Sequence, residues 1–198
     1  MSLKLFGKWD TSGIEIKDPG LHGYINLKPL IVPKTSGRNV KKQFWKNKNS
    51  IIERLINKMM VAGHKGKKHK LTSGRNSGQA YECYNIVKEA LGIIEKKLNK
   101  NPIEVFVKAI ENAAPREEIT TIEYGGAKYP AAVDCSPQRR VDLTLRLMTQ
   151  GAYHKSFNSK TKVSHALADE IMNAYQGDQT SNAIAKKIEV ERQAESSR

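Results

Sequence analysis

Apolar residues recur at helical spacing in several segments of the chain, and this pattern predicts a mainly helical protein. The first helix is expected over residues 50–63, with Ser50 and Glu53 placed as in a capping box. A narrower apolar seam predicts a second helix over 77–99. Asn101-Pro102 then opens a third helix, which ends before Pro115. Further apolar stripes predict helices over 136–152, 163–175 and, with few apolar residues, 180–195.

A change of period marks one β-hairpin at about residues 118–133. Residues 119–124 and 127–133 are rich in β-branched and aromatic side chains, and Gly125-Gly126 separates them. Two glycines in a two-residue connection are typical of a primed turn. Because a lone two-stranded ribbon is only marginally stable, the hairpin either packs on the helices or projects toward a partner that stabilises it.

These elements predict a single mainly α domain of five to six packed helices, with one protruding β-hairpin and an extended basic N-terminal arm. Residues 1–49 form the predicted N-terminal extension, and its first 33 residues contain glycine and proline too often for a long element. Residues 50–198 form the predicted helical domain. The chain has no run of eighteen apolar residues and no apolar signal-peptide core, so we expect an intracellular protein without a membrane association.

Positive charge is concentrated in one stretch of the chain. Residues 34–75 hold thirteen Lys or Arg and a single acid, which is a net charge of +12 out of +14 for the whole chain. A cationic surface of this kind needs a polyanion, and nucleic acid is the usual one. Phe44 and Trp45 lie inside this stretch. They belong either to an arm that orders along a nucleic-acid backbone or to a cap on the core.

Candidate nucleic-acid contacts fall in the arm, in the glycine-rich loop that follows the first helix, and at a helix start. Arg139 and Arg140 occupy the first turn of the helix that begins near Pro137, where the helix dipole disfavours cations unless phosphates compensate. Pairing with Asp134 or Asp142 is the alternative. The arm and the loop contribute Lys34, Arg38, Lys41, Lys42, Lys65, Lys67, Lys68, Lys70 and Arg75.

The sequence gives little support for catalysis, metal binding or disulfides. Cys83 and Cys135 lie 52 residues apart and outside any Cys-x-x-Cys pair, which predicts two reduced structural thiols. Carboxylates near the hairpin offer no evident pocket for the metal ions that a nuclease needs. We therefore expect neither an enzyme nor a bound metal or cofactor.

Three stretches resemble the universal family of small-subunit ribosomal protein S-seven, over roughly residues 48–195. The first is LINKMMVAGHKGKKHK at 55–70. The second runs from Asn101 to Ala152, with Glu-Asn before a proline, the Gly-Gly hairpin and the Arg-Arg helix start in the family's order. The third is Ala-Leu-Ala-Asp-Glu at 166–170. The long N-terminal arm and the loop at 65–78 resemble the archaeal and eukaryotic form.

The resemblance implies a structural protein of the small-subunit head, which binds a junction in the 3′ major domain of the rRNA early in assembly. It implies rRNA contacts at the loop lysines already named and at Arg139, Arg140 and Arg146. It also implies that the hairpin lies near the exit-site tRNA and the mRNA path; the residues concerned are Gly125, Gly126, Lys128 and Tyr129.

Further expectations follow from the same resemblance. They are neighbouring head and platform proteins as partners, a cytoplasmic location in the small ribosomal subunit, and a monomer when the protein is isolated. A free-standing basic module that binds DNA or RNA outside the ribosome is the alternative function.

Overall fold

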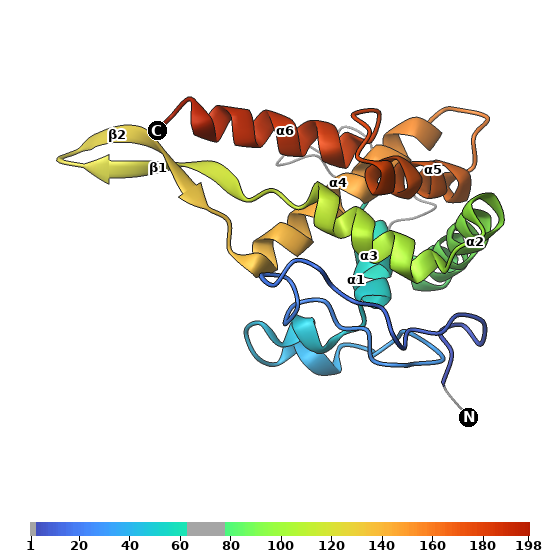
Figure 1. The fold of residues 1–198 in the computed structure, drawn as a ribbon. Helices are drawn as coiled ribbons and strands as arrows, with labels where there is room; N and C mark the ends of the chain where they lie inside the picture. The colour runs from blue at the N-terminus through green and yellow to red at the C-terminus, as the bar shows by residue number, and fades with distance from the viewer. Residues whose placement is uncertain (1–2, 63–77) are drawn as a thin grey trace.

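The computed structural model describes residues 3–62 and 78–198. Within these ranges the chain forms six α-helices and one two-stranded antiparallel sheet (Figure 1). None of these helices is long and apolar enough to cross a membrane. In chain order the elements are the 3-10 turns η1 (Arg38–Val40) and η2 (Trp45–Lys48), α1 (Ile51–Met59), α2 (Ala80–Leu98), α3 (Pro102–Ala113), β1 (Glu117–Tyr124), β2 (Ala127–Asp134), α4 (Pro137–Ser156), α5 (Val163–Gln176) and α6 (Asn182–Glu195).

The prediction of a mainly helical domain with one hairpin is confirmed, and the differences lie at the helix ends. Helix α1 ends at Met59 rather than at Gly63, and α2 begins at Ala80 rather than at Ser77. Both predicted boundary residues, Gly63 and Ser77, lie outside the described residues. The capping-box prediction is wrong, because the Ser50 side chain makes no cap hydrogen bond.

Helix α5 lies at the centre of the helical layer and packs against α2, α3 and α4. Its inner face is fully buried at Leu167 and Ile171, as the apolar stripe predicts. Most of the other buried residues in the same core come from the inner stripes of α1 to α4. One continuous core therefore stabilises all of the described helices, and α6 joins it through Ala183 and Ile184.

The N-terminal segment is irregular in backbone, as its glycines and prolines predict, but part of it belongs to the core. Leu5, Phe6, Trp9, Leu21 and Ile25 are all buried in the same cluster as the helices. The Phe6 ring packs edge-on against Trp9, with ring centroids 5.8 Å apart. Figure 1 shows this segment along the lower side of the helical layer, beneath α1 and α3. The described residues before η1 are therefore held against the domain by apolar contacts.

The hairpin projects from the helical body (Figure 1). Its eight-residue strands pair in register from Glu117↔Asp134 to Tyr124↔Ala127. Gly125 and Gly126 have φ values of 59° and 80°, the left-handed values that a type I′ turn requires at both positions. The predicted primed turn is therefore confirmed.

The base of the hairpin packs against α6, whereas its tip points away from the described helices (Figure 1). The backbone N–H of Arg116 donates to Glu191 Oε1 at 2.9 Å, and Arg198 pairs with Glu117. At the tip, Tyr124 is 82% exposed. The same ribbon is thus fixed at one end and free at the other.

Both cysteines are buried and neither forms a disulfide within the described residues, in agreement with the predicted structural thiols. Burial is the main cause that raises the pKa of Cys83 and of Cys135 to about 11. The two thiols therefore stay protonated at neutral pH, where they behave as small apolar side chains.

One buried carboxylate joins three helices. Glu170 in α5 is 0% exposed, and its Oε1 accepts from Ser181 Oγ at 2.8 Å and from the Ala183 backbone N–H at 3.1 Å. Its Oε2 accepts from Lys155 Nζ of α4 at 3.0 Å. Gly151 leaves the space for this arrangement, because a Cβ there would lie 2.8 Å from the Cβ of Asn182 and 3.0 Å from the Glu170 carboxyl carbon.

Gly151→Ala should therefore lower the free energy of unfolding by about 1–3 kcal/mol, the usual cost of overpacking. Gly92→Ala is the matched control, because Gly92 also lies inside a helix but a Cβ there meets nothing within 4 Å. That control should stabilise the protein by about 0.5–1 kcal/mol through helix propensity. Urea unfolding of both variants measures the difference, and effects of the same sign would contradict this account of Gly151.

Candidate nucleic-acid interface

An open cleft of about 300 Å³ lies between the η2 segment, α1 and the first turns of α4. Four of its lining residues are cations and only one of its described lining residues is an acid. We call it the cationic cleft, and its charged residues are Lys46, Lys58, Arg139, Arg146 and Asp142.

Asp142 holds the walls of the cleft together. Its Oδ1 accepts from Arg54 Nη2 of α1 at 3.1 Å, and its Oδ2 accepts from Gln138 Nε2 at 3.1 Å and also from Lys46. The Arg54 side chain is 4% exposed, and its Nη1 donates to the Tyr24 carbonyl at 2.8 Å. Burial acts to raise the pKa of Asp142, but hydrogen bonds from Lys46 and Gln138 and the charge of Arg54 outweigh it and lower the pKa. This carboxylate is therefore already occupied by two cations.

Two other cations of the cleft, Lys58 and Arg146, lack such compensation. Among the described residues, neither Lys58 nor Arg146 has a carboxylate within ion-pair distance. The pKa of Lys58 is lowered, first by burial, although Asp142 opposes the shift; the positive charges of Lys46, Arg146 and Arg54 lower the pKa further. The cleft thus carries an excess of positive charge in a partly desolvated place, where an anion would be stabilised.

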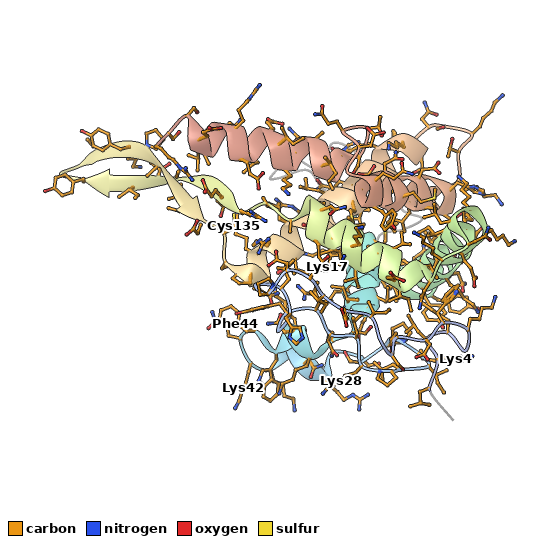
Figure 2. All side chains as sticks on the ribbon, in the orientation of Figure 1. Lys4, Lys17, Lys28, Lys42, Phe44 and Cys135 are labelled. Atoms are coloured by element: carbon orange, nitrogen blue, oxygen red, sulfur yellow. The ribbon has the colours of Figure 1, made fainter. Side chains whose placement is uncertain are left out.

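Neither Phe44 nor Trp45 belongs to the buried core. Phe44 is 60% exposed and lines the cleft, and Figure 2 places it beside the beginning of α4. Trp45 is half-buried beneath two lysines, with Lys48 Nζ 4.1 Å and Lys42 Nζ 5.2 Å from its ring centroid. The alternative in which the two rings cap the core is therefore wrong for Phe44. Its contact with nucleic acid stays a prediction.

Arg139 and Arg140 are neighbours in sequence but point to different surroundings. Arg139 is 56% exposed and forms a two-fold pair with Glu118 of β1, in which Nη2 donates to Oε2 at 2.7 Å. Arg140 is buried, and it donates from Nη2 to Asp18 Oδ2 at 2.7 Å and from Nε to the Pro115 carbonyl at 3.1 Å. The alternative, pairing with Asp134 or Asp142, is therefore wrong for both arginines, because their partners are Glu118 and Asp18.

Comparison with known proteins gives consistent matches over most or all of the chain. Residues 23–198 match the family described as Ribosomal protein S7p/S5e. The chain is 55% identical to the "Small ribosomal subunit protein uS7" of Nanoarchaeum equitans, over all of both chains. It is 48% identical to the protein of that name from Methanosphaera stadtmanae, over 99% of each chain. For Methanothrix thermoacetophila the identity is 47%, over 99% of this chain and all of the relative.

The chain belongs to the ribosomal protein S7p/S5e family. The resemblance found in the sequence is thereby confirmed, and it extends beyond residues 48–195 to the N-terminal segment. The archaeal sources of these relatives agree with the expected archaeal and eukaryotic form. Membership of a ribosomal-protein family also confirms the expectation that the chain is not an enzyme.

In this S7p/S5e protein the structure brings only part of the predicted contact set together. Arg139 and Arg146 share the cationic cleft, whereas Arg140 is buried and does not line it. The residues Lys34, Arg38, Lys41 and Lys42 are exposed on the N-terminal segment, and Figure 2 shows Lys42 on the side away from the helices. Lys128 and Tyr129 are exposed on the hairpin next to Gly125 and Gly126. Outside the described residues lie Lys65, Lys67, Lys68, Lys70 and Arg75.

Sequence reasoning missed Lys46 and Lys58 as members of the site. Lys58 belongs to α1, which we interpreted only as a core helix because of its apolar stripe. Lys46 lies in η2 among several lysines, and nothing local distinguishes it from them. A signal was present for Arg140, because Arg140, Thr144 and Met148 repeat at a spacing of four on the buried side of α4. Arg139 falls outside this row, which is consistent with its exposure.

Arg140→Ala should lower the free energy of unfolding by about 2–3 kcal/mol, because it removes the donor to Asp18 Oδ2 and to the Pro115 carbonyl. Arg139→Ala is the matched control, and it should cost at most about 1 kcal/mol because its ion pair is exposed. Urea unfolding at neutral pH measures both. Equal losses for the two arginines would contradict the distinction drawn between them.

Proposed function

We propose that the chain is a structural component of the small ribosomal subunit and binds rRNA of the 3′ major domain, in the head, through the cationic cleft. The proposal rests first on the relatives, which are full-length matches named as small ribosomal subunit proteins. A cytoplasmic location in that subunit follows from the same assignment. The cleft then supplies a chemical reason for RNA binding.

The observation that carries the proposal is the uncompensated charge of the cleft. Lys58 and Arg146 face the same small volume. Burial is the main cause that lowers the pKa of Lys58, and the positive charges of Lys46 and Arg146 lower it further. RNA phosphates entering this volume would neutralise both cations and release condensed counterions. Lysine and arginine contacts to phosphates give affinity without reading base sequence, which suits recognition of a folded junction by its shape.

The surrounding surfaces extend the proposed contact. The exposed cations of the N-terminal segment would lie along an adjacent RNA backbone, and the loop at 65–75 would add the cations that its sequence supplies. The hairpin carries the exposed Tyr124 and Tyr129 at its free end. We assign this end to the neighbourhood of the exit-site tRNA and the mRNA path, where a partner would stabilise an otherwise marginal ribbon.

The direct test is a salt titration of binding to a transcript of the small-subunit 3′ domain, with unrelated structured RNA as competitor. Tight binding that resists the competitor and falls steeply with salt is expected. If unrelated RNA or a DNA duplex displaces the transcript from the protein equally well, the assignment to the rRNA junction is contradicted. That outcome would favour a free-standing basic module.

Lys58→Ala and Arg146→Ala should each reduce the slope of log K against log salt by about one, because each removes one phosphate contact. Lys186→Ala is the matched control: it also removes one positive charge, but Lys186 lies on α6 and pairs with Glu189. The control should leave the slope unchanged. If all three variants change the slope alike, net charge rather than the cleft determines binding.

A further inference from the structure

A second cavity, of about 660 Å³, lies on another side of α1 and has no role in the cationic cleft. Residues 32–40 of the N-terminal segment form one wall, and α1 and the first turn of α2 form the others. Its size is within the range of small-molecule sites. Most of its described lining is apolar or aromatic, and this part comprises Val32, Pro33, Val40, Ile56, Met60, Ala80, Tyr81 and Tyr84.

One buried carboxylate belongs to this lining. Glu53 is 5% exposed, and its Oε1 accepts from both the backbone N–H and the Oγ1 of Thr35, at 2.8 Å and 2.6 Å. Its Oε2 is also buried but has no hydrogen-bond partner among the described residues. Since a buried acceptor without a donor is unfavourable, a ligand that brings an N–H group into the cavity would be stabilised there.

The surroundings indicate which kind of ligand would bring that group. Tyr81 is 75% exposed and lines the cavity, so that its ring is available for stacking. Lys34 is also part of the lining, and the residues that follow it in the same segment include three more exposed cations. An uncharged flat ring attached to a phosphate fits this combination, whereas a cationic side chain from a protein partner would meet like charges at the entrance.

We propose that this cavity takes an unstacked guanine base of the bound RNA, an inference that rests on the proposed RNA-binding function. A carboxylate oxygen only accepts hydrogen bonds. Guanine presents two adjacent donors, N1–H and the 2-amino group, and no acceptor between them. In adenine and cytosine the amino group lies next to an acceptor nitrogen, and in uracil the single N–H lies between two carbonyls. Single-stranded bases are commonly held by stacking and edge contacts of this type.

Saturation-transfer NMR with free nucleosides tests the cavity without any phosphate contribution. Guanosine should receive saturation from the wild-type protein more strongly than inosine, which lacks the 2-amino group, and much more strongly than uridine. Glu53→Gln keeps an oxygen for Thr35 but replaces Oε2 with an N–H donor, so it should weaken guanosine binding about tenfold or more. Tyr81→Ala should also weaken it, and its exposed position makes a folding defect unexpected.

Equal saturation by all nucleosides, or a guanosine signal unchanged in both variants, would overturn the proposal. Binding of methylguanidinium without binding of guanosine would also overturn it and assign the cavity to an arginine of a protein partner. A parallel salt titration with the rRNA transcript separates this inference from the function. If the wild-type protein binds the transcript but shows no guanosine preference, only the cavity assignment fails. If the transcript is not bound, the proposed function fails.

Discussion

Three charged side chains in the first two turns of α4 hold separate parts of the chain in a fixed arrangement. Arg139 pairs with the hairpin, Arg140 with the loop around Asp18, and Asp142 with α1 and the η2 segment. Each contact joins residues that are more than twenty positions apart in the sequence, so each depends on the tertiary arrangement rather than on local structure. The cationic cleft exists because these contacts converge on the beginning of one helix.

The highly basic N-terminal segment is held to the helical domain by two kinds of contact, apolar packing and hydrogen bonding. Its apolar residues enter the helical core, and the backbone N–H of Lys17 donates to Glu111 of α3 at 2.6 Å. These contacts involve apolar side chains and a backbone N–H and neutralise little charge, so they leave many lysines of the segment without a carboxylate partner. Repulsion among those lysines costs stability in the free protein, and a polyanion would relieve it. Folding and binding therefore place opposite demands on the same segment.

The regular elements were predictable because each has a local cause. Helical periodicity identified each α-helix among the described residues, and the left-handed φ values at Gly125 and Gly126 follow from two glycines between alternating strands. The site was less predictable, because its members meet only through long-range packing. Glu53 reaches Thr35 instead of capping its own helix, and Phe6 packs against Tyr84 far along the chain. Residues so far apart in the sequence do not form a local pattern. The difference in burial between Arg139 and Arg140, by contrast, could be predicted from their positions around the helix.

Arg139 belongs both to the cationic cleft and to the base of the hairpin. A phosphate that takes its guanidinium would compete with Glu118, and the carboxylate so released would no longer hold β1 to α4. Occupation of the cleft and orientation of the hairpin are then thermodynamically linked, and the linkage acts equally in both directions. A ligand that binds the far end of the hairpin in only one of its orientations would therefore alter the affinity of the cleft for a phosphate.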